Sequence, residues 1–177
     1  MRRTIRLGLT GSIGMGKSTA AQRFRERGIA VFDADAEVHA LYEGPLAADI
    51  ETVFPGSVRD GKVDRKALSQ ILLHAPNRFA ELEAIVHPRV RERQRDFLHR
   101  QSEAGAEMVV LEIPLLLESK SPAHVDAIVV VSADPEVQRQ RVLARPGMSA
   151  EKLDELLARQ MPDEEKRRRA DFIVDTS

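Results

Sequence analysis

Five short runs of apolar and β-branched residues are spread along this chain, and segments with helical periodicity separate them. The runs cover residues 4–10, 29–33, 107–113, 126–132 and 171–175. Several of them are almost continuously apolar, which is typical of strands in a parallel sheet that is covered on both faces. The pattern therefore predicts five buried strands joined by helices.

Helices are predicted in the intervals between these strands. The first covers residues 17–27, and Gly28 is placed to end it. The interval 36–106 is helical in pattern almost throughout and contains no good strand. Within it, Asp64 is placed to cap a helix over 65–74, and Pro76 is placed to open the next helix.

The remaining helices are predicted from prolines and a serine at their first positions. A long charged helix is expected over 88–106, starting at Pro88, and shorter helices follow Pro135, Ser149 and Pro162. The order of elements is β-α-β, a helical insertion, and then β-α-β-α-α-β. It predicts an α/β fold with three layers and a five-stranded parallel sheet.

A length of 177 residues fits one domain with a single main core. The expected core with the sheet is 1–35 together with 107–177, and the helical insertion is 36–106. In folds of this kind ligands bind beyond the carboxyl ends of the strands. The residues that follow each strand are therefore the first candidates for a site.

Composition excludes several classes of function. Aromatic residues make up 4% of the chain, with one Tyr and no Trp, which argues against a platform for stacking nucleic-acid bases. The net charge of −1 gives no general attraction to nucleic acid or anionic lipid. The chain has no Cys, and none of its apolar runs reaches the roughly 20 residues of a membrane span. We expect a cytoplasmic protein without nucleic-acid or membrane partners.

The stretch GLTGSIGMGKST at 8–19 carries the strongest chemical signal. It matches the phosphate-binding pattern G-x-x-x-x-G-K-[ST], with a predicted strand before it and a helix after it. Glycine allows the loop to turn backbone N–H groups toward a polyphosphate, and the helix presents its positive end to the same anion. A glycine-rich turn with no ligand is the alternative, but the flanking elements favour a nucleotide site.

The predicted ATP-binding residues follow from this loop. They are Gly11, Ser12, Ile13, Gly14, Met15, Gly16, Lys17, Ser18 and Thr19. Lys17 is expected to contact the β- and γ-phosphates, and the hydroxyl of Ser18 to bind Mg²⁺. Thr19 is placed to reach the α-phosphate.

Other proteins with this loop hydrolyse the nucleotide instead of transferring its phosphate. A guanine-nucleotide switch needs D-x-x-G and N-K-x-D motifs, and neither is present. A motor ATPase needs an aspartate that ends an apolar strand, and Glu112 is at best a variant of it. A kinase instead needs a carboxylate near the γ-phosphate to accept a hydroxyl proton. Asp33 and Asp35, at the end of the second predicted strand, are candidates for that role, although a polar turn with a helix cap explains them equally well.

Arginines on the helix after Pro135 are candidates for holding a transferred phosphate. Arg141 and Arg145 are four residues apart and share a helix face. The helix then breaks at Pro146 and Gly147. This arrangement suits a lid over residues 145–162, whereas a solvated charged helix is the ordinary alternative.

Taken together, the motifs resemble those of the dephospho-CoA kinase family. Besides GLTGSIGMGKST at 8–19, the matching pieces are DAD at 33–35, LEAIVHPRVR at 82–91, IPLLLE at 113–118, VQRQRVLAR at 137–145, RQMPDEEK at 159–166 and ADFIVDT at 170–176. The resemblance implies a P-loop kinase that uses ATP and Mg²⁺ to phosphorylate the ribose 3′-hydroxyl of dephospho-CoA, the last step of coenzyme A synthesis.

The resemblance also implies roles for individual residues. Asp35 would be the general base, supported by Asp33, and Arg141 and Lys17 would stabilise the transferred phosphate. Arg145 would belong to the ATP side of the lid. The implied contacts of dephospho-CoA are Asp33, Asp35, His87, Arg89, Arg91, Leu115 and Glu118.

Some residues favour structural explanations or depart from the family. Without the resemblance, the sequence favours a structural role for His87 at a helix boundary, because Pro88 restricts the backbone of the residue before it. The run 164–169 reads as a solvated helix face, with Lys166 a weaker candidate for the nucleotide site. Thr176 stands where the family usually has Asn, Leu117 stands where it usually has Phe, and relatives usually continue beyond Ser177.

Two other functions stay open on the residues alone. One is a kinase for another small metabolite or a nucleoside monophosphate, and the other is an ATP-binding module without catalysis. The sequence does not determine the oligomeric state, and a monomer is favoured.

Overall fold

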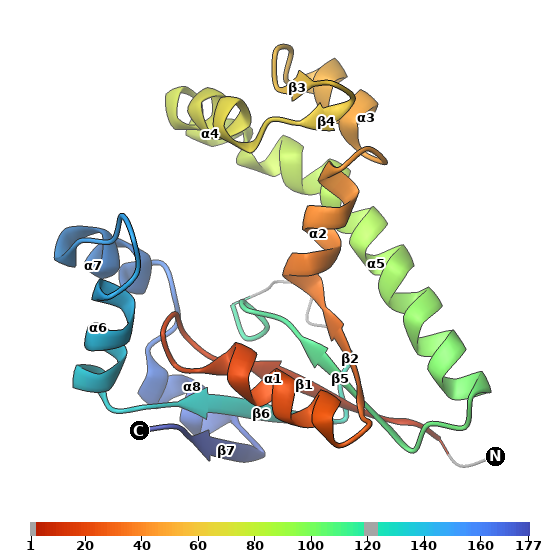
Figure 1. The fold of residues 1–177 in the computed structure, drawn as a ribbon, viewed down its shortest axis with the longest axis vertical. Coiled ribbons are helices and arrows are strands. Elements are labelled where there is room, and N and C mark those ends of the chain that lie inside the picture. The colour runs from red at the N-terminus through yellow and green to blue at the C-terminus, as the bar shows by residue number, and fades with distance from the viewer. Residues whose placement is uncertain (1–2, 119–123) are drawn as a thin grey trace. The chain divides into compact units, whose positions relative to one another are not determined.

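The five predicted strands form one parallel sheet in the order β2-β5-β1-β6-β7 (Figure 1). The computed structural model describes residues 3–118 and 124–177. The strands are β1 (Ile5–Thr10), β2 (Ala30–Asp33), β5 (Met108–Glu112), β6 (Ala127–Ser132) and β7 (Phe172–Asp175). In the register of the sheet, Leu9 of β1 lies between Glu112 of β5 and Val129 of β6. Because all the strands are parallel, their carboxyl ends meet at one edge of the sheet.

Helices on both faces of this sheet make three layers. The helix α1 (Lys17–Glu26) packs on β1, β2 and β5, and α8 (Asp163–Arg169) packs on β6. The helices α6 (Pro135–Leu143) and α7 (Ala150–Ala158) contact each other. Leu7, Leu9 and Val131 face α1 in one hydrophobic cluster. Successive strand residues point to opposite faces. Ser132 accordingly lies on the other side, where its hydroxyl donates to Asp163 Oδ2 of α8 at 2.6 Å.

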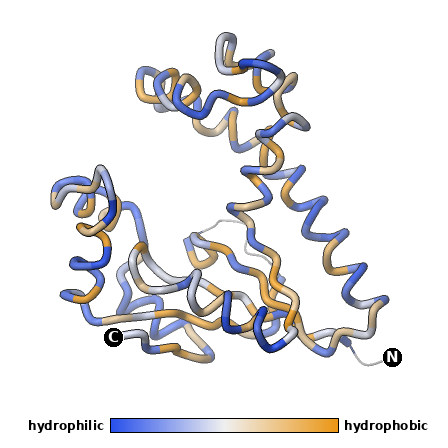
Figure 2. The backbone as a smooth tube through the Cα atoms, in the orientation of Figure 1, coloured by the Kyte–Doolittle hydropathy of each residue, from blue (hydrophilic) through white to orange (hydrophobic). Residues whose placement is uncertain are grey.

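The chain divides into two compact units, Met1–Asp33 with Arg100–Ser177, and Ala34–His99. The first contains the sheet, whose strands carry mostly hydrophobic residues (Figure 2). The sequence placed the boundaries at 36 and 106. They fall earlier because α2 begins at Ala34 and the final turn of the long helix α5 is grouped with the first unit.

The second unit is mainly helical. Its elements are α2 (Ala34–Tyr42), α3 (Ala47–Val53), α4 (Arg65–His74), the 3₁₀ turn η1 (Pro76–Arg78) and α5 (Phe79–Glu103), which extends past His99. Its core contains Leu46, Ile50, Phe54, Leu68 and Val86. The predicted helix over 65–74 is confirmed. Its cap Asp64 accepts hydrogen bonds from the N–H groups of Lys66 and Ala67, both at 3.0 Å.

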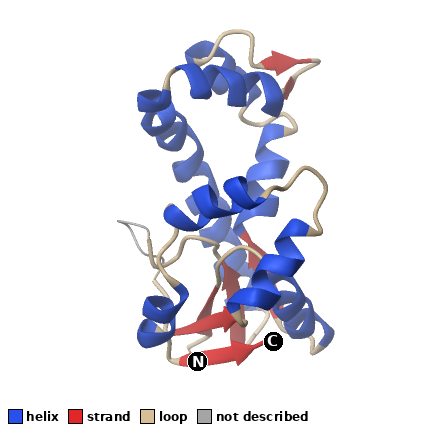
Figure 3. Cartoon of the chain, turned by 90° about the vertical axis from the view of Figure 1, so that its left-hand side faces the viewer, coloured by secondary structure: helices blue, strands red, loops and turns tan. Residues whose placement is uncertain are grey.

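Two predictions in this unit are wrong. A short hairpin, β3 (Val58–Arg59) and β4 (Lys62–Val63), lies among the helices (Figure 3). Its turn is formed by Asp60 and Gly61, both with positive φ, which is typical of a two-residue hairpin. Strands of two residues are too short to give a detectable alternation.

The long helix also starts earlier than predicted. It begins at Phe79 instead of Pro88, which lies inside it. An internal proline costs a helix about 3 kcal/mol. The residues on either side of Pro88 offset this cost by packing, since Val86 is buried in the core of the unit and Val90 packs against that core. His87 is therefore within a helix and not at a boundary.

In residues 3–118 and 124–177, no helix combines the length and the apolar composition needed to cross a membrane.

Candidate phosphate and acceptor site

The loop between β1 and α1 has a backbone that only glycine suits at several positions. Gly14 and Gly16 have φ angles of 78° and 87°, in the left-handed region. A Cβ atom on Gly14 would lie 2.4 Å from Val142 Cγ2, and one on Gly11 would lie 2.7 Å from the carbonyl oxygen of Val131. The first turn of α1 contains no acidic residue. The positive end of this helix is therefore available to an anion, as phosphate binding requires.

Lys17 is held by an acidic partner from the neighbouring strand. Its Nζ donates to Glu112 Oε1 at 2.6 Å, and Glu112 is only 2% exposed. Arg25 Nη2 lies 3.7 Å from the other carboxylate oxygen of Glu112 and 4.0 Å from Asp33 Oδ2. The charge of Lys17 is thus balanced within the protein, and a triphosphate would have to replace Glu112 as its partner.

The sequence pattern indicates Glu112 only as a variant of a motor-ATPase acid and not as a partner of Lys17. In the structure Glu112 is the last residue of β5. Because β5 is the direct neighbour of β1, the ends of these two strands lie together at the edge of the sheet where Lys17 begins α1. The order of the strands would have identified Glu112 as part of the site.

The two aspartates of the DAD stretch take different positions. Asp33 is the last residue of β2, half-buried, and close to Arg25 as described above. Asp35 is exposed in the first turn of α2, where a negative charge is favourable. Asp33 belongs to the first unit and Asp35 to the second, so their roles in a site stay predictions.

Arg141 is brought to the phosphate loop through Thr176. The guanidinium donates to Thr176 Oγ1 at 3.0 Å and to the Thr176 carbonyl at 2.6 Å. The Thr176 hydroxyl in turn donates to the carbonyl of Met15 at 2.7 Å. Arg145 is exposed two residues beyond the end of α6, next to the turn at Gly147. The structure therefore groups Arg141 with the loop and leaves Arg145 in solvent.

Glu118 is already bonded within the protein. Its Oε1 accepts from the N–H of Met161 at 2.9 Å and lies 2.8 Å from Lys166 Nζ. Lys166 is fully buried, at 0% exposure. The expectation that the helix over 164–169 presents a solvated face is wrong for this residue, because the apolar stem of Lys166 is enclosed while its charge pairs with Glu118. Leu115, in the same turn as Glu118, is exposed.

His87, Arg89 and Arg91 lie on the helix α5 and are all exposed. His87 and Arg91 are four residues apart and share one face of the helix. Arg89 points elsewhere and lies 3.3 Å from Glu92. The helix presents two of these three residues together, and their contact with an acceptor stays a prediction.

The residues around the loop fit a magnesium ion that is held mainly by phosphate and water. Among the described residues, no group of three or more His, Cys, Asp or Glu side chains is arranged to bind a metal. Magnesium in nucleotide sites usually takes one or two protein oxygens and keeps several waters. The exposed Ser18, at the second position of α1, can supply one such oxygen.

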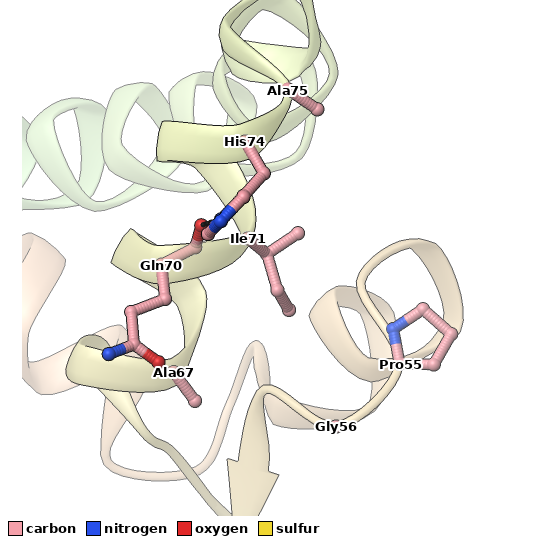
Figure 4. Close-up of a pocket in the computed structure, with 7 residues that line it drawn as sticks. All are labelled: Pro55, Gly56, Ala67, Gln70, Ile71, His74 and Ala75. Atoms are coloured by element: carbon pink, nitrogen blue, oxygen red, sulfur yellow. Dashed lines mark hydrogen bonds between the residues drawn. The ribbon is translucent and has the colours of Figure 1, made fainter.

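A groove of about 610 Å³ lies within the helical unit (Figure 4). It is lined by Pro55, Gly56, Ala67, Gln70, Ile71, His74 and Ala75. The ring of His74 bonds to the carbonyl of Gln70 on its own helix at 2.8 Å. The lining contains no Lys or Arg, so this groove is not suited to a polyphosphate.

Comparisons with known proteins agree on one family. The family model described as Dephospho-CoA kinase matches residues 5–177. A dephospho-CoA kinase of Rhizobium meliloti (strain 1021) is 58% identical over 171 residues, covering 97% of this chain and 88% of that protein. One of Rhodopseudomonas palustris (strain HaA2) is 56% identical, covering 97% and 86%.

Two solved structures share the fold. A crystal structure of a Thermus thermophilus protein has a TM-score of 0.84 at 38% identity, covering 99% of this chain and 90% of that one. The dephospho-CoA kinase from Campylobacter jejuni has a TM-score of 0.73 at 26% identity, covering 97% and 88%. These likenesses extend over both the sheet and the helical unit.

Proposed function

This chain belongs to the dephospho-CoA kinase family, and from that premise we propose that it transfers the γ-phosphoryl group of ATP to the ribose 3′-hydroxyl of dephospho-CoA. The observation that carries the proposal is the loop at the end of β1, whose left-handed glycines precede Lys17 and an uncapped helix end. The products are CoA and ADP, and the reaction is the last step of coenzyme A biosynthesis.

The donor is held by the loop and by cations around it. Lys17 exchanges its ion pair with Glu112 for the β- and γ-phosphates, and this exchange leaves Glu112 next to Arg25. Arg141 likewise exchanges its bonds to Thr176 for an oxygen of the transferred group. Both cations stabilise negative charge where it develops in the transition state. The hydroxyl of Ser18 would hold a magnesium ion, which would neutralise further charge on the donor.

The acceptor is activated by a carboxylate. Asp35 accepts the proton of the 3′-hydroxyl as its oxygen forms a bond to the γ-phosphorus, and the bond from that phosphorus to the β-phosphate oxygen breaks. Asp33 supports this group from the end of β2. His87, Arg89, Arg91 and Leu115 are the proposed contacts of dephospho-CoA. Glu118 is also a proposed contact of dephospho-CoA, and its Oε1 accepts a hydrogen bond from the N–H of Met161.

The proposal is tested by acceptor dependence. ADP release is measured with ATP alone and with ATP plus dephospho-CoA, AMP or shikimate. Release that depends on dephospho-CoA supports the proposal, and phosphorus NMR of the product locates the new phosphate on the 3′-oxygen. Turnover with AMP or shikimate instead would indicate a different kinase, and ATP binding without any acceptor-dependent turnover would indicate a binding module. A cytoplasmic location and a monomeric state stay predictions.

A further inference from the structure

Ile13, the third residue of the phosphate loop, has its backbone carbonyl and its backbone N–H both bonded to glutamine side chains. The carbonyl of Ile13 accepts from Gln138 Nε2 at 2.7 Å, and the N–H of Ile13 donates to Gln160 Oε1 at 3.2 Å. The backbone groups of Ile13 fix the orientation of both glutamine amides. The Ile13 carbonyl can only accept, so Gln138 turns its NH₂ group to it, and the Ile13 N–H can only donate, so Gln160 turns its oxygen to it. Neither glutamine has a role in the function proposed above.

Both glutamines are themselves held in place. Gln138 is 6% exposed on α6, and the same helix contacts the loop closely, since a Cβ on Gly14 would lie 3.1 Å from the Gln138 carbonyl. Gln160 lies in the connection between α7 and α8. The next residue, Met161, is tied by its N–H to Glu118, which pairs with the buried Lys166. The chain of contacts thus runs from the buried ion pair to the loop.

We propose that Gln138 and Gln160 are positioning residues that set the peptide orientation of Ile13 and thereby preorganise the phosphate loop for ATP. This inference rests on the proposed use of the loop as the ATP site. The N–H of Ile13, expected from the sequence to face a phosphate, is instead satisfied by Gln160. The two bonds also connect the loop to α6, which carries Arg141, and to the connection at 159–162, which belongs to the predicted lid.

The two bonds have opposite polarity, and this gives a matched test. Gln138→Glu places a carboxylate against the Ile13 carbonyl, where two acceptors repel. Gln160→Glu places a carboxylate against the Ile13 N–H, where it still accepts. Each variant adds one negative charge beside the same residue, so the general repulsion of ATP is common to both. The difference between them reports the hydrogen bonds.

ATP binding to the full chain is measured by calorimetry without acceptor, at about 0.3 M salt to screen the added charges. We expect Gln138→Glu to bind ATP about 5-fold or more weakly than Gln160→Glu, as the loss of one hydrogen bond predicts. In turnover assays the KM for ATP should rise while kcat and the KM of the acceptor stay unchanged, because the lost interaction is uniform binding. If Gln138 had a purely structural role, its replacement would lower the thermal midpoint without a selective rise in the KM for ATP.

Because Gln138 is buried, its variant can fail to fold, and a second measurement keeps the test decisive. Hydrogen exchange of the Ile13 amide should be several-fold faster in Gln160→Met, whose thioether is only a weak acceptor, and close to wild type in Gln160→Glu. Equal ATP affinities in the two Glu variants, or unchanged Ile13 exchange in Gln160→Met, would overturn the inference. Both readouts need no acceptor, so a chain that binds ATP but does not phosphorylate dephospho-CoA refutes the proposed reaction and leaves this test intact.

Discussion

The Nζ atom of Lys17 lies 2.6 Å from Oε1 of Glu112, a residue 95 positions away in the sequence and almost fully buried. The lysine that is proposed to bind ATP is thus neutralised by a carboxylate from the adjacent strand. Under the proposed function, nucleotide binding is an exchange of partners at Lys17, since the triphosphate competes with an existing ion pair.

Replacing the carboxylate of Glu112 should destabilise the fold, and bound ATP should reduce this loss of stability. We expect Glu112→Gln to lower the free energy of unfolding by about 2 kcal/mol without nucleotide, because a part-buried ammonium loses its charged partner. Saturating ATP should narrow the difference, as Lys17 then bonds to phosphate. Urea unfolding with and without ATP measures both effects. Glu43→Gln, in an exposed pair with Lys62 that is also 2.6 Å long, is the control and should change the midpoint little. Identical behaviour of the two variants would contradict the exchange.

Removing the proposed base should separate binding from transfer. Asp35→Asn should retain the affinity for ATP and lose about 10²- to 10⁴-fold in turnover, which is the usual contribution of a general base. Calorimetry and the ADP-release assay give the two quantities. Asp49→Asn makes the same chemical change at an exposed position of α3 in the same unit and should leave both unchanged. Near-normal turnover of Asp35→Asn would remove this residue from the mechanism.

Alanine at Gly14 of the phosphate loop should destabilise the protein more than alanine at a glycine with positive φ outside the loop. Gly105→Ala introduces only backbone strain, since φ is 75° and nothing lies within 4 Å of the new Cβ, and should cost about 1 kcal/mol. Gly14→Ala adds a collision with Val142 and should cost about 3 kcal/mol or more. Thermal unfolding and ATP calorimetry test the pair. Intact ATP binding by Gly14→Ala would mean that the loop has room that the structure does not show.

The capping carboxylate of Asp64 should make the stability of the helical unit depend on pH. The hydrogen bond from the Ala67 N–H is the main cause that holds the pKa of this capping carboxylate below its usual range. A carboxylate with a lower pKa in the folded state stabilises the fold above its unfolded pKa, and this contribution is lost as the pH falls through the folded pKa. Asp64→Asn keeps an acceptor but does not titrate.

The difference in urea midpoint between wild type and Asp64→Asn should therefore be constant at neutral pH. As the pH falls below about 4, the urea midpoint of the wild type should fall relative to that of Asp64→Asn. A difference that stays constant down to pH 3, or one that shifts in favour of the wild type, would show that the cap does not contribute in its charged form.

The sequence alone determined the fold and predicted the donor site. Apolar runs of the right length identified all five strands of the sheet. In β1, β5 and β6 the run is continuous because most residues of these strands are buried. The spacing of Gly11, Gly16, Lys17 and Ser18 identified the phosphate loop for a similar reason, since the residues of such a loop are neighbours in the chain. Asp64 was identified as a cap from a local rule that the structure confirms.

The tertiary structure alone decided which side chains hold that site together. Lys17 with Glu112, Arg141 with Thr176, Ile13 with Gln138 and Gln160, and Lys166 with Glu118 are all pairs distant in sequence. Periodicity and spacing describe which face of an element is buried, and they carry no information on which element lies beside it. The order of strands in the sheet places Glu112 beside the loop, and the packing of α8 against β6 encloses Lys166, which its charged neighbours had placed in solvent.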